Sequence, residues 1–158
     1  MGSRWASVAG VWLAGLVVSP GTAVAQAVPE LGVIAMATAS DPAIVAAGAY
    51  GGLRTSLRTR VSAALLAGVS DGEAAWRGEL LAHFLLNPTR LRGVGVYGAG
   101  GIALVGGPVD RSYIVLTLGV EARPAASSGW FVEAGVGGGA RLAAGYRWRR
   151  FPARWRGF

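Results

Sequence analysis

The feature that most constrains this chain is a regular alternation of residue type along four segments, residues 74–86, 113–122, 130–140 and 142–148. Within each segment, every charged residue falls on one parity, which in the first segment also holds His83, and the other parity is apolar. A period of two places successive side chains on opposite faces of a β-strand. The sequence therefore predicts strands with one apolar and one polar face, and the polar positions are Arg77, Glu79, His83, Glu121, Glu133 and Arg147.

The composition indicates which solvent the apolar face meets. Charged residues make up 15% of the chain, whereas an ordinary soluble domain has about 25%. Aromatic residues stand near strand ends on the apolar parity, as they do in the girdles of membrane barrels; they are Trp76, Phe84, Trp130, Tyr146 and Trp148. These features predict that lipid lies on the apolar side and that the charged side lines the interior.

The first residues have the pattern of a secretory signal peptide. Arg4 precedes an apolar run, a break at Ser19–Gly21 follows, and the small residues Ala23 and Ala25 fit a cleavage site. We predict a signal peptide over residues 1–25, a β-barrel over 26–149 and a basic, aromatic C-terminal tail over 150–158. The absence of cysteine fits an exported chain.

Turn signals divide the remainder into eight candidate strands separated by short connections. This arrangement predicts an all-β fold, an eight-stranded antiparallel up-and-down transmembrane β-barrel. With both termini in the periplasm, the connections near Asp41, Asp71, Pro108 and Gly138 would be extracellular. The expected strands cover residues 30–39, 43–53, 58–69, 73–86, 92–105, 111–122, 130–137 and 140–149.

Other classes fit the sequence less well. A helical membrane protein needs uncharged runs of about 20 residues, but the uncharged run at residues 93–107 contains seven glycines, which disfavour a helix. Nucleic-acid binding is not expected, although the net charge is +7, because the arginines gather at turns and in the last twelve residues. A soluble periplasmic β-barrel remains an alternative, with the apolar face lining a cavity for a small apolar ligand.

The layout resembles the small eight-stranded outer-membrane β-barrel proteins of bacteria, the OmpA-like and OmpX-like group, from about residue 30 to residue 149. The resemblance depends on the signal peptide, the strand count, the alternation and the last strand, where Leu142, Ala144, Tyr146 and Trp148 alternate. It implies location in the outer membrane, contact with outer-membrane lipid and recognition of the last strand by the barrel assembly machinery.

The charged residues on the polar face of the predicted strands form the candidate site, a charge cluster in the lumen. The lumen of an eight-stranded barrel is just wide enough for side chains, and unpaired buried charge is costly, so we expect ion pairs and a filled interior. A hairpin centred near residues 139–140 would place Glu133 almost opposite Arg147. A small gated channel is the alternative. The expected cluster is Arg58, Arg60, Arg77, Glu79, His83, Glu121, Glu133 and Arg147, with Arg149 as a further candidate.

Catalysis is not expected. His83 could meet Ser62 of the neighbouring strand, as a Ser–His–acid hydrolase requires, but both would face the interior, where lipid does not reach. The pattern GxGxxG at residues 93–98 lies inside a strand and does not open a helix, so it predicts no nucleotide site. We predict no cofactor and no metal, and a structural or interfacial role.

Overall fold

A computed structural model describes residues 27–108 and 110–152. The predicted signal peptide and most of the predicted tail lie outside the described residues. Among these residues, no helix is long and apolar enough to cross a membrane. The strands are β1 (Val28–Ala39), β2 (Ile44–Arg54), β3 (Thr59–Ser70), β4 (Glu73–Leu85), β5 (Val94–Gly106), β6 (Arg111–Ala122), β7 (Ser128–Val136) and β8 (Ala140–Arg149).

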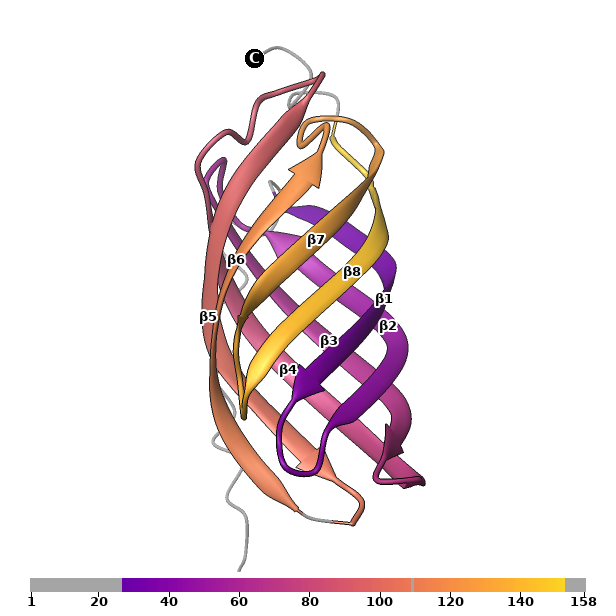
Figure 1. Cartoon of the computed structure of the whole chain (residues 1–158). Coiled ribbons are helices and arrows are strands. Elements are labelled where there is room, and N and C mark those ends of the chain that lie inside the picture. Colours follow the sequence, from indigo (N-terminus) through magenta and orange to yellow (C-terminus); the bar gives the residue numbers. More distant parts are fainter. Residues whose placement is uncertain (1–26, 109, 153–158) are drawn as a thin grey trace, which may run out of the picture.

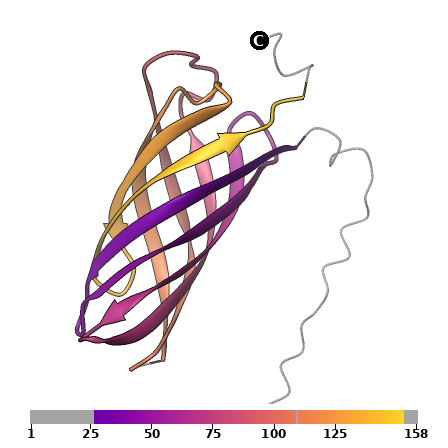
Figure 2. The same cartoon turned by 90° about the vertical axis from the view of Figure 1, so that its right-hand side faces the viewer.

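The strands form a closed antiparallel barrel in which each pairs with the next and β8 pairs with β1. Figures 1 and 2 show the strands tilting around a tube, with β1 beside β8. The predicted all-β, eight-stranded antiparallel barrel is therefore confirmed, and each strand boundary lies within two residues of its predicted position.

The two ends of the barrel differ in their connections. We call the end that carries both ends of the described chain the terminal end; its connections are residues 55–58, 86–93 and 123–127. The opposite end, here the hairpin end, has connections at residues 40–43, 71–72, 107–110 and 137–139. The tight turn between β3 and β4 places Asp71 and Gly72 at φ of 52° and 81°, which suits a two-residue hairpin turn with Asp-Gly.

Side chains alternate between the interior and the outer surface of the tube. Along β1 the pattern is strict, with buried Glu30, Ile34 and Met36 separated by exposed Leu31 and Val33. The interior therefore holds most of the buried charge together with a smaller apolar component. That component gathers around Tyr50 and Phe131, whose ring centroids lie 5.8 Å apart, and around Leu81 and Val115.

Glycine makes room for large interior side chains. Gly119 on β6 lies opposite Tyr97 on β5, and the Tyr97 ring lies across the glycine inside the barrel. A Cβ added at Gly119 would come within 2.7 Å of the Tyr97 hydroxyl oxygen. Because that hydroxyl donates a hydrogen bond to Glu133 at 2.8 Å, the ring cannot move without breaking a buried contact.

We predict that Gly119→Ala lowers the free energy of unfolding by about 1–3 kcal/mol, as overpacking does in other cores. The measurement is urea unfolding of the barrel in lipid vesicles, followed by tryptophan fluorescence. Gly98→Ala is the matched control, because a Cβ there would meet its nearest neighbour, Leu118 Cδ2, at an ordinary 3.7 Å. Equal stability of the two variants would show that Tyr97 does not depend on the missing side chain at position 119.

Candidate functional site: the charged interior

The interior arginines and glutamates form two clusters along the barrel axis. The terminal cluster, nearer the terminal end, contains Glu30, Glu121, Arg54, Arg60, Arg147 and Arg149. The hairpin cluster contains Glu79, Glu133, Arg77 and Arg141. All ten side chains are buried.

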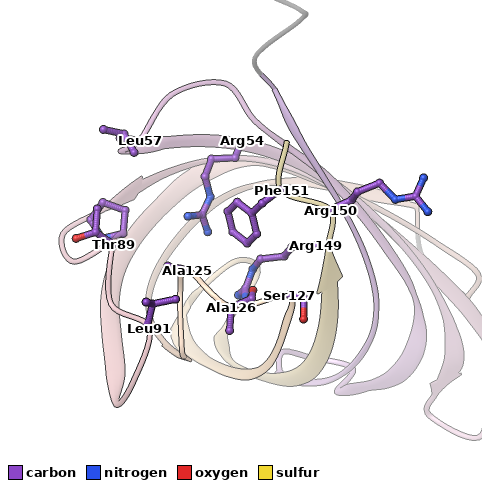
Figure 3. A pocket seen from close by; sticks show the side chains of 11 residues that line it. Arg54, Leu57, Thr89, Leu91, Ala125, Ala126, Ser127, Arg149, Arg150 and Phe151 are labelled. Carbon is purple, nitrogen blue, oxygen red and sulfur yellow. The ribbon is translucent and has the colours of Figure 1, made fainter. Parts of the chain in front are cut away.

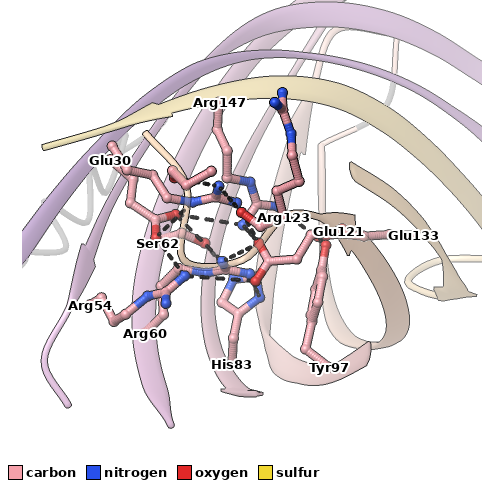
Figure 4. A network of polar contacts seen from close by, with 12 residues as sticks. Glu30, Arg54, Arg60, Ser62, His83, Tyr97, Glu121, Arg123, Glu133 and Arg147 are labelled. Carbon is pink, nitrogen blue, oxygen red and sulfur yellow. Dashed lines mark hydrogen bonds and ion pairs between the residues drawn. The ribbon is translucent and has the colours of Figure 1, made fainter. Parts of the chain in front are cut away.

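Glu121 accepts the shortest contacts of the terminal cluster. Its Oε2 accepts hydrogen bonds from Arg60 Nη1 at 3.0 Å and from Arg149 Nη2 at 2.7 Å. Arg147 Nη1 lies 3.2 Å from the same oxygen. These arginines come from β3 and β8 and Glu121 from β6, so the contacts cross the lumen, as Figure 4 shows.

Glu30 shares the same arginines but holds them less closely. Its ion pairs with Arg54, Arg60, Arg147 and Arg149 measure 3.3 to 3.5 Å. Arg147 is further held by aromatic rings, with its Cζ 4.0 Å from the centroid of Phe131 and 5.0 Å from that of Tyr50. Cation–π contacts of this kind stabilise desolvated guanidinium groups.

In the hairpin cluster, Arg141 joins both carboxylates. Its Nε and Nη2 donate to the two oxygens of Glu79 at 3.0 and 2.7 Å, and its Nη1 donates to Glu133 at 2.9 Å. Arg77 donates to Glu79 at 2.8 Å and to the Gly137 carbonyl at 3.0 Å. A two-pronged guanidinium–carboxylate contact is the strong form of this pairing.

Tyr97 links the clusters. Its hydroxyl donates to Glu133 at 2.8 Å and accepts from Arg147 Nη2 at 3.2 Å. The polar contacts therefore continue from one cluster to the other along the lumen.

The clusters differ in charge. The hairpin cluster has two arginines and two glutamates, so its formal charges cancel. The terminal cluster has four arginines for two glutamates and a formal charge of +2. No other carboxylate is buried in the described part of the chain. The excess positive charge therefore lies toward the terminal end.

His83 meets Ser62, with 2.7 Å between its Nε2 and the serine Oγ. Its Nδ1 lies 3.2 Å from Arg60 Nη2. A guanidinium can only donate, so Nδ1 accepts and the proton of the neutral ring is on Nε2, from which it points to Ser62. A serine hydrolase needs the opposite arrangement, with Nε2 free to take the serine proton and an acid beside Nδ1.

The structure places seven of the eight expected lumen residues inside the barrel: Arg60, Arg77, Glu79, His83, Glu121, Glu133 and Arg147; the further candidate Arg149 is also buried there. Arg58 is exposed in the connection between β2 and β3, because β3 begins one residue later and the alternation does not extend to it.

The expected pairing of Glu133 with Arg147 was wrong. Glu133 lies opposite Ala143, and its salt bridge is with Arg141. The hairpin centres on Gly138, within a run of three glycines, and Gly138 and Gly139 have φ of 87° and 155°. Any of these glycines can form the turn, so the sequence left the register open.

Three charged interior residues were not in the predicted cluster: Glu30, Arg54 and Arg141. The predicted second strand ends at residue 53, whereas Arg54 is the last residue of β2 and is 1% exposed. Each lies at or near the end of a strand, at a position whose side chain faces the interior. Continuing the alternation of inward and outward positions to the strand ends would therefore have identified them. No group of three or more His, Cys, Asp or Glu side chains in the described ranges is placed to hold a metal ion.

Comparison with known proteins gives a likeness of fold. No family model and no curated sequence matches the chain. Among solved structures, the N-terminal β-barrel domain of Pseudomonas aeruginosa OprF superimposes with a TM-score of 0.56 and 12% identity, over 75% of this chain and 97% of that one. The eight-stranded barrel architecture implied by the resemblance to the OmpA-like group is thus shown.

We predict that Glu121→Gln lowers the free energy of unfolding by about 3–5 kcal/mol, because it leaves four buried arginines with one carboxylate. Arg54→Gln should cost less than half as much, since it reduces the excess positive charge and removes ion pairs of 3.3 and 3.7 Å. Urea unfolding in lipid vesicles measures both.

Asp71→Asn is the control for loss of a carboxylate, because Asp71 is exposed in a hairpin turn; we expect a change within about 0.5 kcal/mol. If Arg54→Gln were as harmful as Glu121→Gln, the charge imbalance would have no energetic consequence.

Proposed function

We propose that this protein is an outer-membrane β-barrel with a filled, ion-paired interior and a structural or interfacial role without catalysis. The observation that carries the proposal is the combination of an apolar outer face with a charged interior. The fold likeness to the OprF barrel domain supports it, as does the signal-peptide pattern of residues 1–25.

The outer face exposes large apolar side chains around the tube. Ile114 is 77% exposed, Leu118 72% and Leu31 69%. Soluble monomers rarely expose contiguous apolar patches beyond a few hundred Å². Exposed Trp130, Trp148 and Phe84 lie toward the terminal end, which fits an aromatic girdle at one lipid–water interface. Trp76 is exposed toward the hairpin end.

The soluble alternative required the apolar face to line an internal cavity for an apolar ligand. In the structure that face points outward and the interior holds ten arginine and glutamate side chains. An apolar ligand inside would have to displace these ion pairs. The arrangement therefore favours lipid as the solvent of the apolar face.

The absence of catalysis is part of the proposal and is supported by the histidine geometry. Nε2 of His83 carries the proton that points to Ser62, and a guanidinium stands where an acid would be needed. Both side chains are buried inside the barrel, so an outside substrate does not reach them.

The filled interior also distinguishes our proposal from the channel alternative. Fully buried Arg60, Arg147 and Tyr97 occupy the lumen. Between the clusters, beside Tyr50, His83 and Arg141, the structure has a cavity of about 10 Å³, close to the space for one water molecule. A guanidinium network of this kind stops ion flow unless it rearranges.

Expression in a diderm bacterium tests the location. We expect the protein in the outer-membrane fraction, with heat-modifiable gel migration typical of a closed barrel. Recovery in the soluble periplasmic fraction would contradict the proposal.

A lipid-face variant tests the solvent of the outer surface. Leu118→Arg should destabilise the barrel in vesicles by about 2–4 kcal/mol if position 118 is near the bilayer midplane. Leu57→Arg, in an exposed turn, should change stability by less than about 0.5 kcal/mol. Equal effects would argue against lipid at β6.

Planar-bilayer recording separates the filled barrel from a channel. We expect no steady current from the wild-type protein. Glu121→Gln, which loosens the terminal cluster, should give brief openings at most. Steady wild-type conductance would favour the channel.

A further inference from the structure

A cavity of about 520 Å³ opens at the terminal end of the barrel, within the usual size range of small-molecule sites, about 300–1,000 Å³. The connections between β2 and β3, β4 and β5, and β6 and β7 line it, together with residues that follow β8. Figure 3 shows the Arg54 side chain extending toward the middle of the ring of lining residues.

The floor of this cavity is positively charged. Arg54 and Arg149 both line it and both belong to the terminal cluster, which carries the formal charge of +2. Arg54 is 1% exposed, and its Nε has no hydrogen-bond partner among the described residues. Its Nη2 has only the ion pairs of 3.3 and 3.7 Å with Glu30 and Glu121. Its Cζ lies 5.7 Å from the centroid of the Phe151 ring. A buried guanidinium with an unused Nε donor, in a cluster with more arginines than carboxylates, favours an anionic partner.

The walls of the cavity are largely apolar. Their apolar lining residues are Leu57, Pro88, Leu91, Ala125 and Ala126. A ligand that satisfies both floor and walls has an anionic head and a short apolar body.

The rim has the same sign of charge as the floor. All exposed charged residues of the terminal-end connections are arginines, and these segments contain no acidic residue. The exposed acidic residues lie at the hairpin end. The rim arginines are Arg58, Arg90, Arg92, Arg123 and Arg150, and the acidic residues are Asp41, Asp71, Glu73 and Asp110. A mouth of one sign above a low-dielectric wall concentrates ions of opposite charge.

We propose that this cavity binds a single-chain anionic amphiphile, with its phosphate or carboxylate head against Arg54 and Arg149 and its chain against Leu57, Pro88 and Leu91. The chain beyond Pro152 adds two arginines and no acidic side chain, so charge complementarity favours a separate anionic ligand over that segment. The site depends on the fold and on the charge imbalance, and not on the location of the barrel in the cell.

The test is titration calorimetry of the full chain in nanodiscs of zwitterionic lipid, with empty nanodiscs subtracted. Octyl phosphate is the probe, inorganic phosphate tests the head alone, and octyl glucoside tests the chain alone. We expect one octyl phosphate per barrel, bound at least tenfold more tightly than either control and more weakly as salt rises.

Arg54→Gln should weaken octyl phosphate binding at least tenfold. Leu57→Glu, which places a negative charge at the mouth in an exposed turn, should do the same and serves if the buried change impairs folding. Arg111→Gln is the matched control, because it removes an exposed arginine at the hairpin end, and it should leave the affinity within twofold of the wild type.

Three results would overturn the proposal. Equal affinity for octyl phosphate and inorganic phosphate would mean that the apolar walls contribute nothing. Equal affinity for octyl glucoside would mean that the arginine floor contributes nothing. Wild-type affinity in both Arg54→Gln and Leu57→Glu would place the binding elsewhere. Each result can occur in a protein that is correctly inserted in the outer membrane, so the proposed function is judged separately.

Discussion

Four buried glutamates hold six buried arginines inside this barrel, and the arrangement of the other elements follows from that requirement. Removing a guanidinium or a carboxylate from water costs several kcal/mol, and only close, well-oriented partners offset it. The partners come from opposite walls: Arg141 on β8 reaches Glu79 on β4, and Arg60 on β3 reaches Glu121 on β6. Contacts across the lumen therefore select one tube diameter and one set of strand registers.

The outer face imposes the complementary requirement. Leucine, valine and isoleucine side chains surround the tube, and in our proposal lipid takes the place of a hydrophobic core around them. The interior is then free to be polar, and it is specified by hydrogen bonds and cation–π contacts. Glycines such as Gly119 adjust the fit by giving the Tyr97 ring its place between the two clusters.

Much of this fold could be predicted from the sequence because the information is local. Turn residues mark the strand ends, and the parity of Glu121 or Glu133 shows which face is polar. The partners of Glu121 could not be predicted, because they meet it across the lumen rather than along a strand pair. The pairing of Glu133 depended on which of three glycines forms a turn, and Arg54 was missed because it stands where a strand meets a connection.

The pairing of β8 with β1 has a consequence for how the molecule is assembled. The first strand made during synthesis keeps an unpaired edge until the last strand is complete. Until then, Glu30 on β1 has no ion pair with Arg147 and Arg149 on β8. In lipid, an open edge leaves backbone groups unsatisfied at a cost of several kcal/mol each. Partly assembled forms are therefore disfavoured, because they leave both backbone groups and charged side chains without partners. If the barrel lies in lipid, as we propose, closure of the sheet, formation of the terminal cluster and entry into the membrane form a single cooperative event.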